Sequence, residues 1–255
     1  MSTLVDYRVD GCAAWLKLNS PHNRNALSTA LVEQLHDGFS RASADPAVRV
    51  VILSHTGSTF CAGADLGETA GAGVAETALA RAGEMTRLLR RILECPMPVI
   101  AAVDGHVRAG GMGLVGACDI AVAGAASSFA LTEARIGVAP SIISLTLIPK
   151  LTARAAARYF LTGEKFDADV AAEIGLITVA TDDVAASVST FVSAVQRGSP
   201  QGLAASKALT TAAILADFDR RAEKLTQESA ALFDSAEARE GMLAFLEKRP
   251  PHWAV

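Results

Sequence analysis

The sequence predicts an α/β fold built around at least one parallel sheet. Twice in succession, from residues 48 and 99, an apolar strand leads into a segment of small residues and then into a helix. Alternation of this kind is typical of parallel sheets, because the helix carries the chain back to the start of the next strand. From residue 141 onward the pattern is almost entirely helical, which predicts a helical region after the sheet.

The elements follow from local signals. Residues 4–9 and 12–18 are expected to pair as strands that turn at Asp10-Gly11, a strong hairpin dipeptide. Ser28 is placed to cap a helix whose apolar positions begin at Leu31. Further strands are expected at 48–53, 99–103, 119–123 and 175–179, and further helices at 74–94, 199–213, 216–232 and 235–248.

Composition predicts a well-packed, soluble protein. Of 255 residues, 51% are hydrophobic and 20% are charged, enough for a large core with a helical appendage. The net charge is −4 and no run of Lys or Arg exceeds two residues, which argues against a nucleic-acid or anionic-membrane partner. Apolar runs are short and no signal-peptide pattern is present, so we expect a cytoplasmic protein.

Cysteines and histidines show no metal-binding spacing. Cys12, Cys61, Cys95 and Cys118 lie far apart without a C-x-x-C pair, and the five histidines form no ligand motif. We therefore expect no metal site, and thiols that behave as small hydrophobic groups in a reducing compartment. Cys61 as a nucleophile lacks an established base, so a buried thiol is favoured there.

Residues 58–66 form the first segment with chemical potential. Ala62, Gly63 and Ala64 are small, so a ligand can approach the backbone, and backbone N–H groups can then stabilise a developing oxyanion. The alternative is a tight turn between a strand and a helix, with Asp65 as the N-cap.

Residues 104–116 form the second segment. Gly111, Gly113 and Gly116 match G-x-G-x-x-G, and Glu133 follows about twenty residues later, as in NAD(P)-binding oxidoreductases. Two features oppose that hypothesis: several residues separate the strand from Gly111, and the helix that follows is too short for a full crossover.

Glu133 lies in the third segment, residues 129–137. A carboxyl group between small and apolar neighbours after a strand can have a raised pKa and act as a general base. The alternative is a solvated side chain, or one paired with Arg135.

These three segments, in this order, resemble the enoyl-CoA hydratase/isomerase (crotonase) superfamily. The resemblance extends over essentially the whole chain and includes residues 23–28, 118–119, 161–164 and 240–249. It implies a spiral of ββα units over residues 1–195 and a helical region over 196–255 that mediates trimerisation and covers coenzyme A. It also implies a homotrimer or hexamer, an acyl-CoA substrate of the kind met in fatty acid metabolism, and no cofactor beyond the coenzyme A of the substrate.

The resemblance also implies roles for individual residues. The N–H groups of Ala64 and Gly110 would hold the thioester oxygen, and Glu133 would be the acid/base. Phe245 and Lys248 would reach the nucleotide end of coenzyme A, often that of a neighbouring subunit. The other positions implied to contact the substrate are Arg24, Ala26, Leu27, Ala62, Gly63, Asp65, Leu66, Gly111 and Thr132.

One departure from the family pattern concerns the reaction. Hydratases of this family usually carry two glutamates, and the first falls at Gly113 here, so that only Glu133 remains. The turn at 138–144 is also changed. Two carboxylates naturally share the work of adding water, whereas moving a double bond along the acyl chain needs one base. Overall similarity, strongest to bacterial hydratases over residues 129–176 and including the methylglutaconyl-CoA group, favours a hydratase. The single glutamate favours an isomerase, and another thioester reaction or a non-catalytic CoA binder remains a further alternative.

Overall fold

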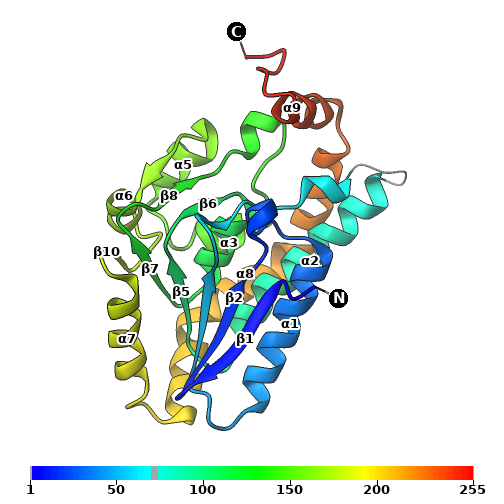
Figure 1. The fold of residues 1–255 in the computed structure, drawn as a ribbon. Helices are drawn as coiled ribbons and strands as arrows, with labels where there is room; N and C mark the ends of the chain where they lie inside the picture. The colour runs from blue at the N-terminus through cyan, green and yellow to red at the C-terminus, as the bar shows by residue number, and fades with distance from the viewer. Residues whose placement is uncertain (1, 70–73, 255) are drawn as a thin grey trace.

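A six-stranded sheet forms one part of the core. The computed structural model describes residues 2–69 and 74–254 (Figure 1). The strand order is β1-β2-β3-β5-β7-β10, antiparallel between β1 and β2 and parallel between all other neighbours. The strands are β1 (Val5–Asp10), β2 (Ala13–Leu18), β3 (Val50–His55), β5 (Val99–Val103), β7 (Ile120–Gly124) and β10 (Val179–Thr181).

A smaller sheet of four strands, in the order β4-β6-β8-β9, holds the segments that the sequence singled out. Its first three strands are parallel, and β9 is antiparallel to β8. Each strand has only two or three residues, and none of the four was predicted. They are β4 (Thr59–Cys61), β6 (His106–Arg108), β8 (Ser128–Ala130) and β9 (Phe166–Asp167).

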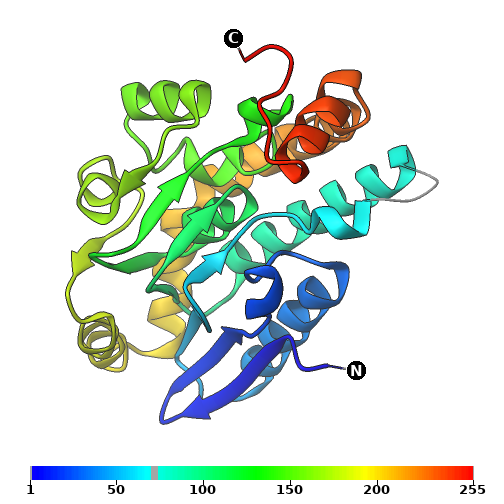
Figure 2. The same ribbon diagram turned by 45° about the horizontal axis from the view of Figure 1, so that its top comes forward.

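The chain passes repeatedly from the large sheet to the small one. β3 leads to β4, β5 to β6 and β7 to β8, and the order of neighbours is the same in both sheets. Each turn of chain therefore stacks on the turn before it, as the views in Figures 1 and 2 show. This arrangement confirms the predicted spiral of ββα units.

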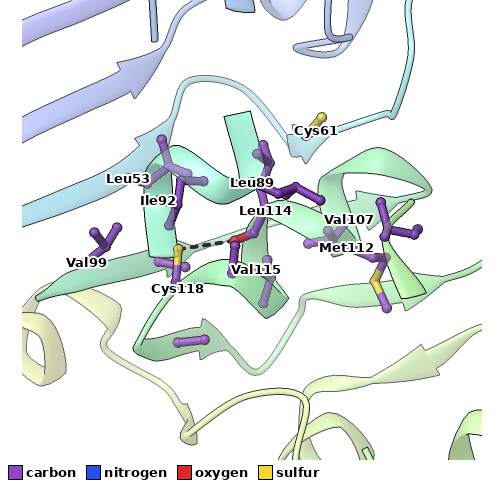
Figure 3. Close-up of a cluster of buried hydrophobic side chains, with 14 of the residues drawn as sticks. Leu53, Cys61, Leu89, Ile92, Val99, Val107, Met112, Leu114, Val115 and Cys118 are labelled. Atoms are coloured by element: carbon purple, nitrogen blue, oxygen red, sulfur yellow. Dashed lines mark hydrogen bonds between the residues drawn. The ribbon is translucent and has the colours of Figure 1, made fainter. Parts of the chain in front are cut away.

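Helices cover both faces of the large sheet. Apolar side chains of α1, α2, α3 and α8 pack on one face, and those of α7 on the other. Figure 3 shows part of the apolar cluster beneath α1, α2, α3 and α8, where the Cys118 thiol donates to the Leu114 carbonyl at 3.2 Å. The helices are α1 (Thr29–Ala44), α2 (Val74–Glu94), α3 (Gly110–Ala117), α4 (Ser144–Leu147), α5 (Ala153–Thr162), α6 (Ala168–Glu173), α7 (Val184–Val195), α8 (Pro200–Phe233) and α9 (Ala236–Leu246), with 3-10 turns η1 (Pro21–Asn23), η2 (Leu66–Thr69) and η3 (Glu133–Ile136).

Most predicted elements are present, several with the expected bounds. The hairpin turns at Gly11, whose φ of +57° suits glycine. The helix at 74–94 and the strand at 99–103 have the predicted bounds, and Ser28 caps α1 by accepting a hydrogen bond from the Leu31 N–H.

Two predictions in the C-terminal half were wrong. The helices expected at 199–213 and 216–232 are one helix, α8, because Ile214 at the supposed break is buried against the core. The strand expected at 175–179 lies later, at β10, because Gly175 forms a turn with a φ of +89°. The division of the chain at residue 196 stays a prediction. No helix within the described ranges 2–69 and 74–254 is long and apolar enough to cross a membrane.

A buried lysine joins α8 to the rest of the core. Lys207 Nζ donates to the carbonyl oxygens of Ile92 at 2.9 Å and Met97 at 3.1 Å. It also pairs with Asp119 Oδ2 at 2.8 Å, and the same oxygen accepts from the Val99 N–H at 2.7 Å. One ammonium group therefore satisfies polar groups from the end of α2, the next turn and the start of β7.

We expect Lys207→Met to lower the free energy of unfolding by about 3–5 kcal/mol, because it leaves the Asp119 carboxylate without its buried partner. Urea unfolding measures this change as a lower midpoint at an unchanged slope. Lys224→Met is the matched control: it removes an exposed pair with Glu228, 3.5 Å apart, on the same helix, and should cost less than about 1 kcal/mol. Equal midpoints for the two variants would contradict the role assigned to Lys207.

Candidate active site

The first arm of the site is the segment that follows β4. Gly63 has a φ of +95°, and a methyl group there would lie 2.8 Å from the Ala109 Cβ. The Gly63 carbonyl accepts from the Leu27 N–H at 2.8 Å, and the Leu27 carbonyl accepts from the Asp65 N–H at 3.3 Å. These two bonds engage the Gly63 carbonyl and the Asp65 N–H, on either side of Ala64. The Ala64 N–H itself donates to no group in the described part of the chain. Ala64 is an exposed residue.

The second arm is the segment that follows β6. Ala109 has a φ of +46°, an uncommon value for alanine, and turns the chain sharply into α3. Gly110 is the first residue of that helix, so its N–H has no carbonyl partner within the helix. Among the described residues this N–H has no other acceptor.

The two arms lie side by side. A methyl group at Gly63 would be 3.3 Å from the Gly110 nitrogen, and one at Gly110 would be 3.6 Å from the Gly63 Cα. Leu27 packs beside both arms: a methyl group at Gly110 would lie 3.1 Å from the Leu27 Cδ1. Two unpaired N–H groups, of Ala64 and Gly110, are therefore carried on adjoining segments.

Glu133 begins the 3-10 turn η3, just beyond β8. Pairing of Arg108 with Ala130 brings the end of β8 beside the second arm, and the Ala109 N–H donates to the Ala130 carbonyl at 3.3 Å. The Glu133 side chain is only 8% exposed, and its Oε2 has no hydrogen-bond partner in the described structure. Burial raises the pKa of this carboxyl to about 7. The alternative, a side chain that is solvated or paired with Arg135, is not observed: Glu133 is buried, and the Arg135 Nε donates to the Thr162 carbonyl at 3.1 Å.

The turn that carries Glu133 rests directly on α9. A methyl group at Gly137, which has a φ of +76°, would lie 2.7 Å from the carbonyl carbon of Glu237. A methyl group at Gly241 would lie 2.6 Å from the Cα of Ile136. Backbone therefore meets backbone at both points, with no side chain between η3 and α9.

Apolar side chains fill the place beside Gly113. A Cβ at this position, one helical turn after Gly110, would meet the Ile143 Cγ2, would lie 2.9 Å from the Ile143 Cβ and would lie 3.2 Å from the Met85 Cε. The Gly113 carbonyl accepts from the Thr146 hydroxyl at 3.1 Å, which joins α4, the helix after the 138–144 turn, to α3. Gly113 is not among the glycines with a positive φ, so packing alone excludes a side chain there.

Asn25 holds the loop that precedes the first arm. Arg24 and Asn25 both have left-handed backbone, with φ of +59° and +53°. The buried Asn25 side chain accepts from the Ser20 N–H at 2.7 Å and donates to the carbonyls of Thr56 at 3.0 Å and Thr59 at 2.7 Å. This role of Asn25 was not predicted from the sequence, although asparagine is a residue that tolerates left-handed backbone in turns.

Several other predicted residues surround the first arm. The Arg24 carbonyl accepts from the Ala62 N–H at 3.1 Å, so the loop and the arm are joined, and the Arg24 side chain is exposed. Ala26 is buried, and Thr132, directly before Glu133, is half-buried. Gly111 lies against Cys61, where a methyl group would be 2.8 Å from the Cys61 Cβ.

Asp65 has a structural role that agrees with the alternative reading of its segment. Its Oδ1 accepts from the Gly67 N–H at 3.0 Å, as a cap of the turn η2, and its Oδ2 accepts from the Asn23 amide at 3.0 Å. The side chain of Leu66 lies outside the described residues.

Phe245 and Lys248 lie apart from these groups. They sit at the end of α9, near the C-terminus in Figure 1, and the Phe245 side chain is 56% exposed. Their predicted place beside the nucleotide of a neighbouring subunit stays a prediction.

The rival hypotheses find no support in this geometry. Gly111, Gly113 and Gly116 lie inside α3, where they allow close packing rather than forming a loop between a strand and a helix. Burial raises the pKa of the Cys61 thiol to about 12, so Cys61 is not a nucleophile at neutral pH. Within the ranges that the structure describes, no group of three or more His, Cys, Asp or Glu residues could hold a metal ion.

Comparison with known proteins defines the class. The family described as enoyl-CoA hydratase/isomerase matches residues 10–255, so the chain belongs to the enoyl-CoA hydratase/isomerase (crotonase) superfamily. It is similar to the crystal structure of an enoyl-CoA hydratase from Mycobacterium avium, with 68% identity, full coverage of both chains and a TM-score of 0.94. A Rhodobacter capsulatus relative named "Probable enoyl-CoA hydratase" is 33% identical over 98% of this chain and 97% of its own length. The mevalonyl-coenzyme A hydratase of Aspergillus fumigatus is 32% identical over 99% of this chain and 98% of its own length.

We expect Glu133→Gln to raise the free energy of unfolding above pH 7. Burial raises the folded-state pKa from 4.5 to about 7, so the unfolded state releases its proton first as the pH rises. The contribution of Glu133 to stability therefore falls between these two values. Gln keeps the size and cannot ionise, so the variant should gain about 3 kcal/mol at pH 8 and almost nothing at pH 4. Urea unfolding across this range measures the gain, and a gain that does not vary with pH would contradict a buried, ionising Glu133.

Proposed function

We propose that the protein hydrates an enoyl-CoA, with the thioester oxygen held between the N–H groups of Ala64 and Gly110 and with Glu133 as acid/base. The observation that carries this proposal is the pair of unpaired N–H groups on adjoining arms, together with a buried carboxyl with a free oxygen just beyond β8, the strand that pairs with β6. Two donors aimed at one oxygen stabilise an enolate, and each is typically worth about 3–4 kcal/mol in the transition state.

One carboxyl group can carry both proton transfers of hydration. The Glu133 carboxylate accepts a proton from water while the water oxygen bonds to C3 of the substrate. The electron pair of the C2–C3 double bond moves toward the thioester oxygen, where the Ala64 and Gly110 N–H groups hold the negative charge. The protonated Glu133 then donates its proton to C2, so that one water has been added and the carboxylate is restored.

The pKa of Glu133 suits this work. A group that both accepts and donates a proton is most effective when its pKa lies near the working pH, and burial raises the pKa of Glu133 to about 7. The free Oε2 supports the assignment, because a carboxyl group with a structural role would have its buried oxygens paired.

The remaining predicted residues are proposed to bind the substrate. Residues around the first arm would line the channel for coenzyme A, and the end of α9 would cover the nucleotide of a neighbouring subunit. Assembly as a trimer or hexamer is part of this proposal, supported by the exposed apolar side chains Leu243, Phe245 and Leu246 on α9. A monomer in sedimentation at micromolar concentration would contradict it. The proposed binding residues are Arg24, Ala26, Leu27, Ala62, Gly63, Asp65, Leu66, Gly111, Thr132, Phe245 and Lys248.

A specific observation favours isomerisation as a second candidate. Ile143 and Met85 occupy the space beside Gly113 where a second carboxylate would project, so this side of the site is apolar. Isomerisation of a 3-enoyl-CoA needs no water: Glu133 removes a proton from C2, the enolate forms, and Glu133 returns the proton to C4. The double bond then lies between C2 and C3.

We expect Glu133→Gln to reduce kcat by about 10²–10⁴-fold with every accepted substrate, while the affinity for the CoA ester stays nearly unchanged. Gln keeps the size but cannot accept a proton. The assay uses 2-enoyl-, 3-enoyl- and 3-methylglutaconyl-CoA, with products identified by mass and by double-bond position. An added mass of one water identifies a hydratase, and an unchanged mass with a moved double bond identifies an isomerase.

Two outcomes of this assay would contradict the proposal. Near-full activity of Glu133→Gln would remove Glu133 from the chemistry. If the wild-type protein binds CoA esters but turns over none of the substrates, it is a non-catalytic binder. Calorimetry with NADH and NADPH is the control for the nucleotide-binding alternative, and no binding is expected.

We expect Gly113→Glu alone to unfold the protein or block the site, because the new Cβ would meet Ile143. The double variant Gly113→Glu with Ile143→Gly removes that contact, and we expect it to fold and to raise hydration relative to isomerisation. Circular dichroism and CoA-ester affinity are measured with each assay. A stable single variant would contradict the packing account. A folded, binding double variant with unchanged hydration would show that the absent carboxylate does not limit the reaction.

A further inference from the structure

The two arms of the site begin at adjacent strands. β3 and β5 are parallel neighbours in the large sheet; β3 leads to the first arm and β5 leads to the second. His55 is the last residue of β3, and Asp104 is the first residue after β5. His55 Nε2 accepts a hydrogen bond from the Asp104 N–H at 2.9 Å, so the two arms are joined where they leave the sheet.

The His55 ring contacts both of the segments that lead from the large sheet to the arms. It packs nearly perpendicular to the ring of Phe60, with centroids 5.6 Å apart at 82°, and Phe60 is a fully buried residue of β4. On the other side lies Gly105, where a methyl group would be 3.2 Å from the His55 Cε1 and 2.7 Å from the Ser58 carbonyl carbon. The imidazole therefore lies between β4, which leads to the first arm, and the turn before β6, which leads to the second.

Beyond His55, the segments that lead to the two arms are joined by few hydrogen bonds. β4 and β6 have three residues each, and their pairing shifts register between Thr59 and Cys61. The His106 N–H donates to the Ser58 carbonyl at 3.0 Å. Strands this short contribute little pairing, so the contact at their start has a large share in fixing their relative position.

We infer that His55 is a positioning residue that fixes the distance between the Ala64 and Gly110 N–H groups by joining the starts of the two arms. This inference rests on the proposed function, in which those two groups hold the thioester oxygen. His55 does not touch the substrate; it acts through Asp104 and Phe60.

The role requires a neutral ring. Nε2 accepts from Asp104, so the ring proton is on Nδ1, which lies 3.4 Å from the Thr56 carbonyl. Burial lowers the pKa of His55 below its ordinary 6.5; the Lys17 ammonium on β2 also lowers this pKa, and the Asp104 carboxylate and hydrogen bonds to backbone carbonyls oppose the shift. A proton on Nε2 would face the Asp104 N–H and break the bond. The contribution of this bond to stability is therefore present above the ordinary pKa of histidine and is lost as the pH falls through the lowered one.

The test compares His55→Leu, which removes the acceptor, with His55→Gln, whose side-chain oxygen can replace Nε2. The probe is 3-oxobutanoyl-CoA, a thioester whose enolate absorbs in the near ultraviolet, so that its ionisation on the protein reports the strength of the oxygen site without turnover. We expect His55→Leu to raise the apparent pKa of the bound probe by about one unit and to lower kcat about tenfold or more, with KM changed less than about twofold. His55→Gln should restore most of both losses.

The pH profile gives a second readout. Below the pKa of His55, a plot of log kcat/KM against pH for the wild type should have a slope of about 2, because protonation of Glu133 and protonation of His55 each lower the activity. In His55→Gln the slope should be about 1, because only Glu133 is then protonated. The control is His36→Leu: His36 is half-buried on α1 and burial also lowers its pKa, but Arg87 and Arg91 of α2 face it and neither arm does. This control should leave the probe and kcat unchanged.

The outcomes separate the two proposals. If the wild type does not ionise the bound probe, the proposed oxygen site itself is wrong. If the wild type ionises it and a folded His55→Leu does so equally, the positioning role is wrong. If His55→Leu does not fold, the profile of His55→Gln decides, and a fall that still involves two protons overturns the inference.

Discussion

A methyl group at Gly63 would lie 3.3 Å from the Gly110 nitrogen and 2.8 Å from the Ala109 Cβ. This close approach of two backbone segments constrains much of the structure around it. It needs the left-handed backbone of Gly63 and Ala109, and it needs both segments to leave one sheet from adjacent strands. The asparagine loop around Asn25 and the bridge at Leu27 then hold the outer side of the first segment.

The carboxyl of Glu133 illustrates a cost that the fold accepts. An ionised, buried carboxylate with a free oxygen is unfavourable, and the raised pKa expresses that cost. The turn η3 is held from outside by the backbone contacts of Gly137 and Ile136 with α9. Stability and proton transfer are thus in competition at one residue, as is usual where a protein places a reactive group.

Long, regular patterns made most strands of the large sheet and several of its helices predictable from the sequence, whereas β10 and the continuity of α8 were not predicted. The helix α2 and the strand β5 carry their own periodicity, so local residues decide them. The strands of the small sheet could not be predicted, since each has two or three residues and exists only through partners tens of residues away. The same distinction applies to the site. The small residues beside Ala64 and the apolar surroundings of Glu133 are visible locally, whereas the contacts of Ile143 and His55 depend on the folded chain.

The meeting of η3 with α9 has a mechanical consequence. At Gly137 and Gly241 the two backbones touch without side chains between them, and side chains are what normally absorb small displacements in a packed interior. The position of the turn is therefore tied closely to that of the helix. A small displacement of the C-terminal helix reaches the turn that carries Glu133 directly, although the two are more than a hundred residues apart in the chain.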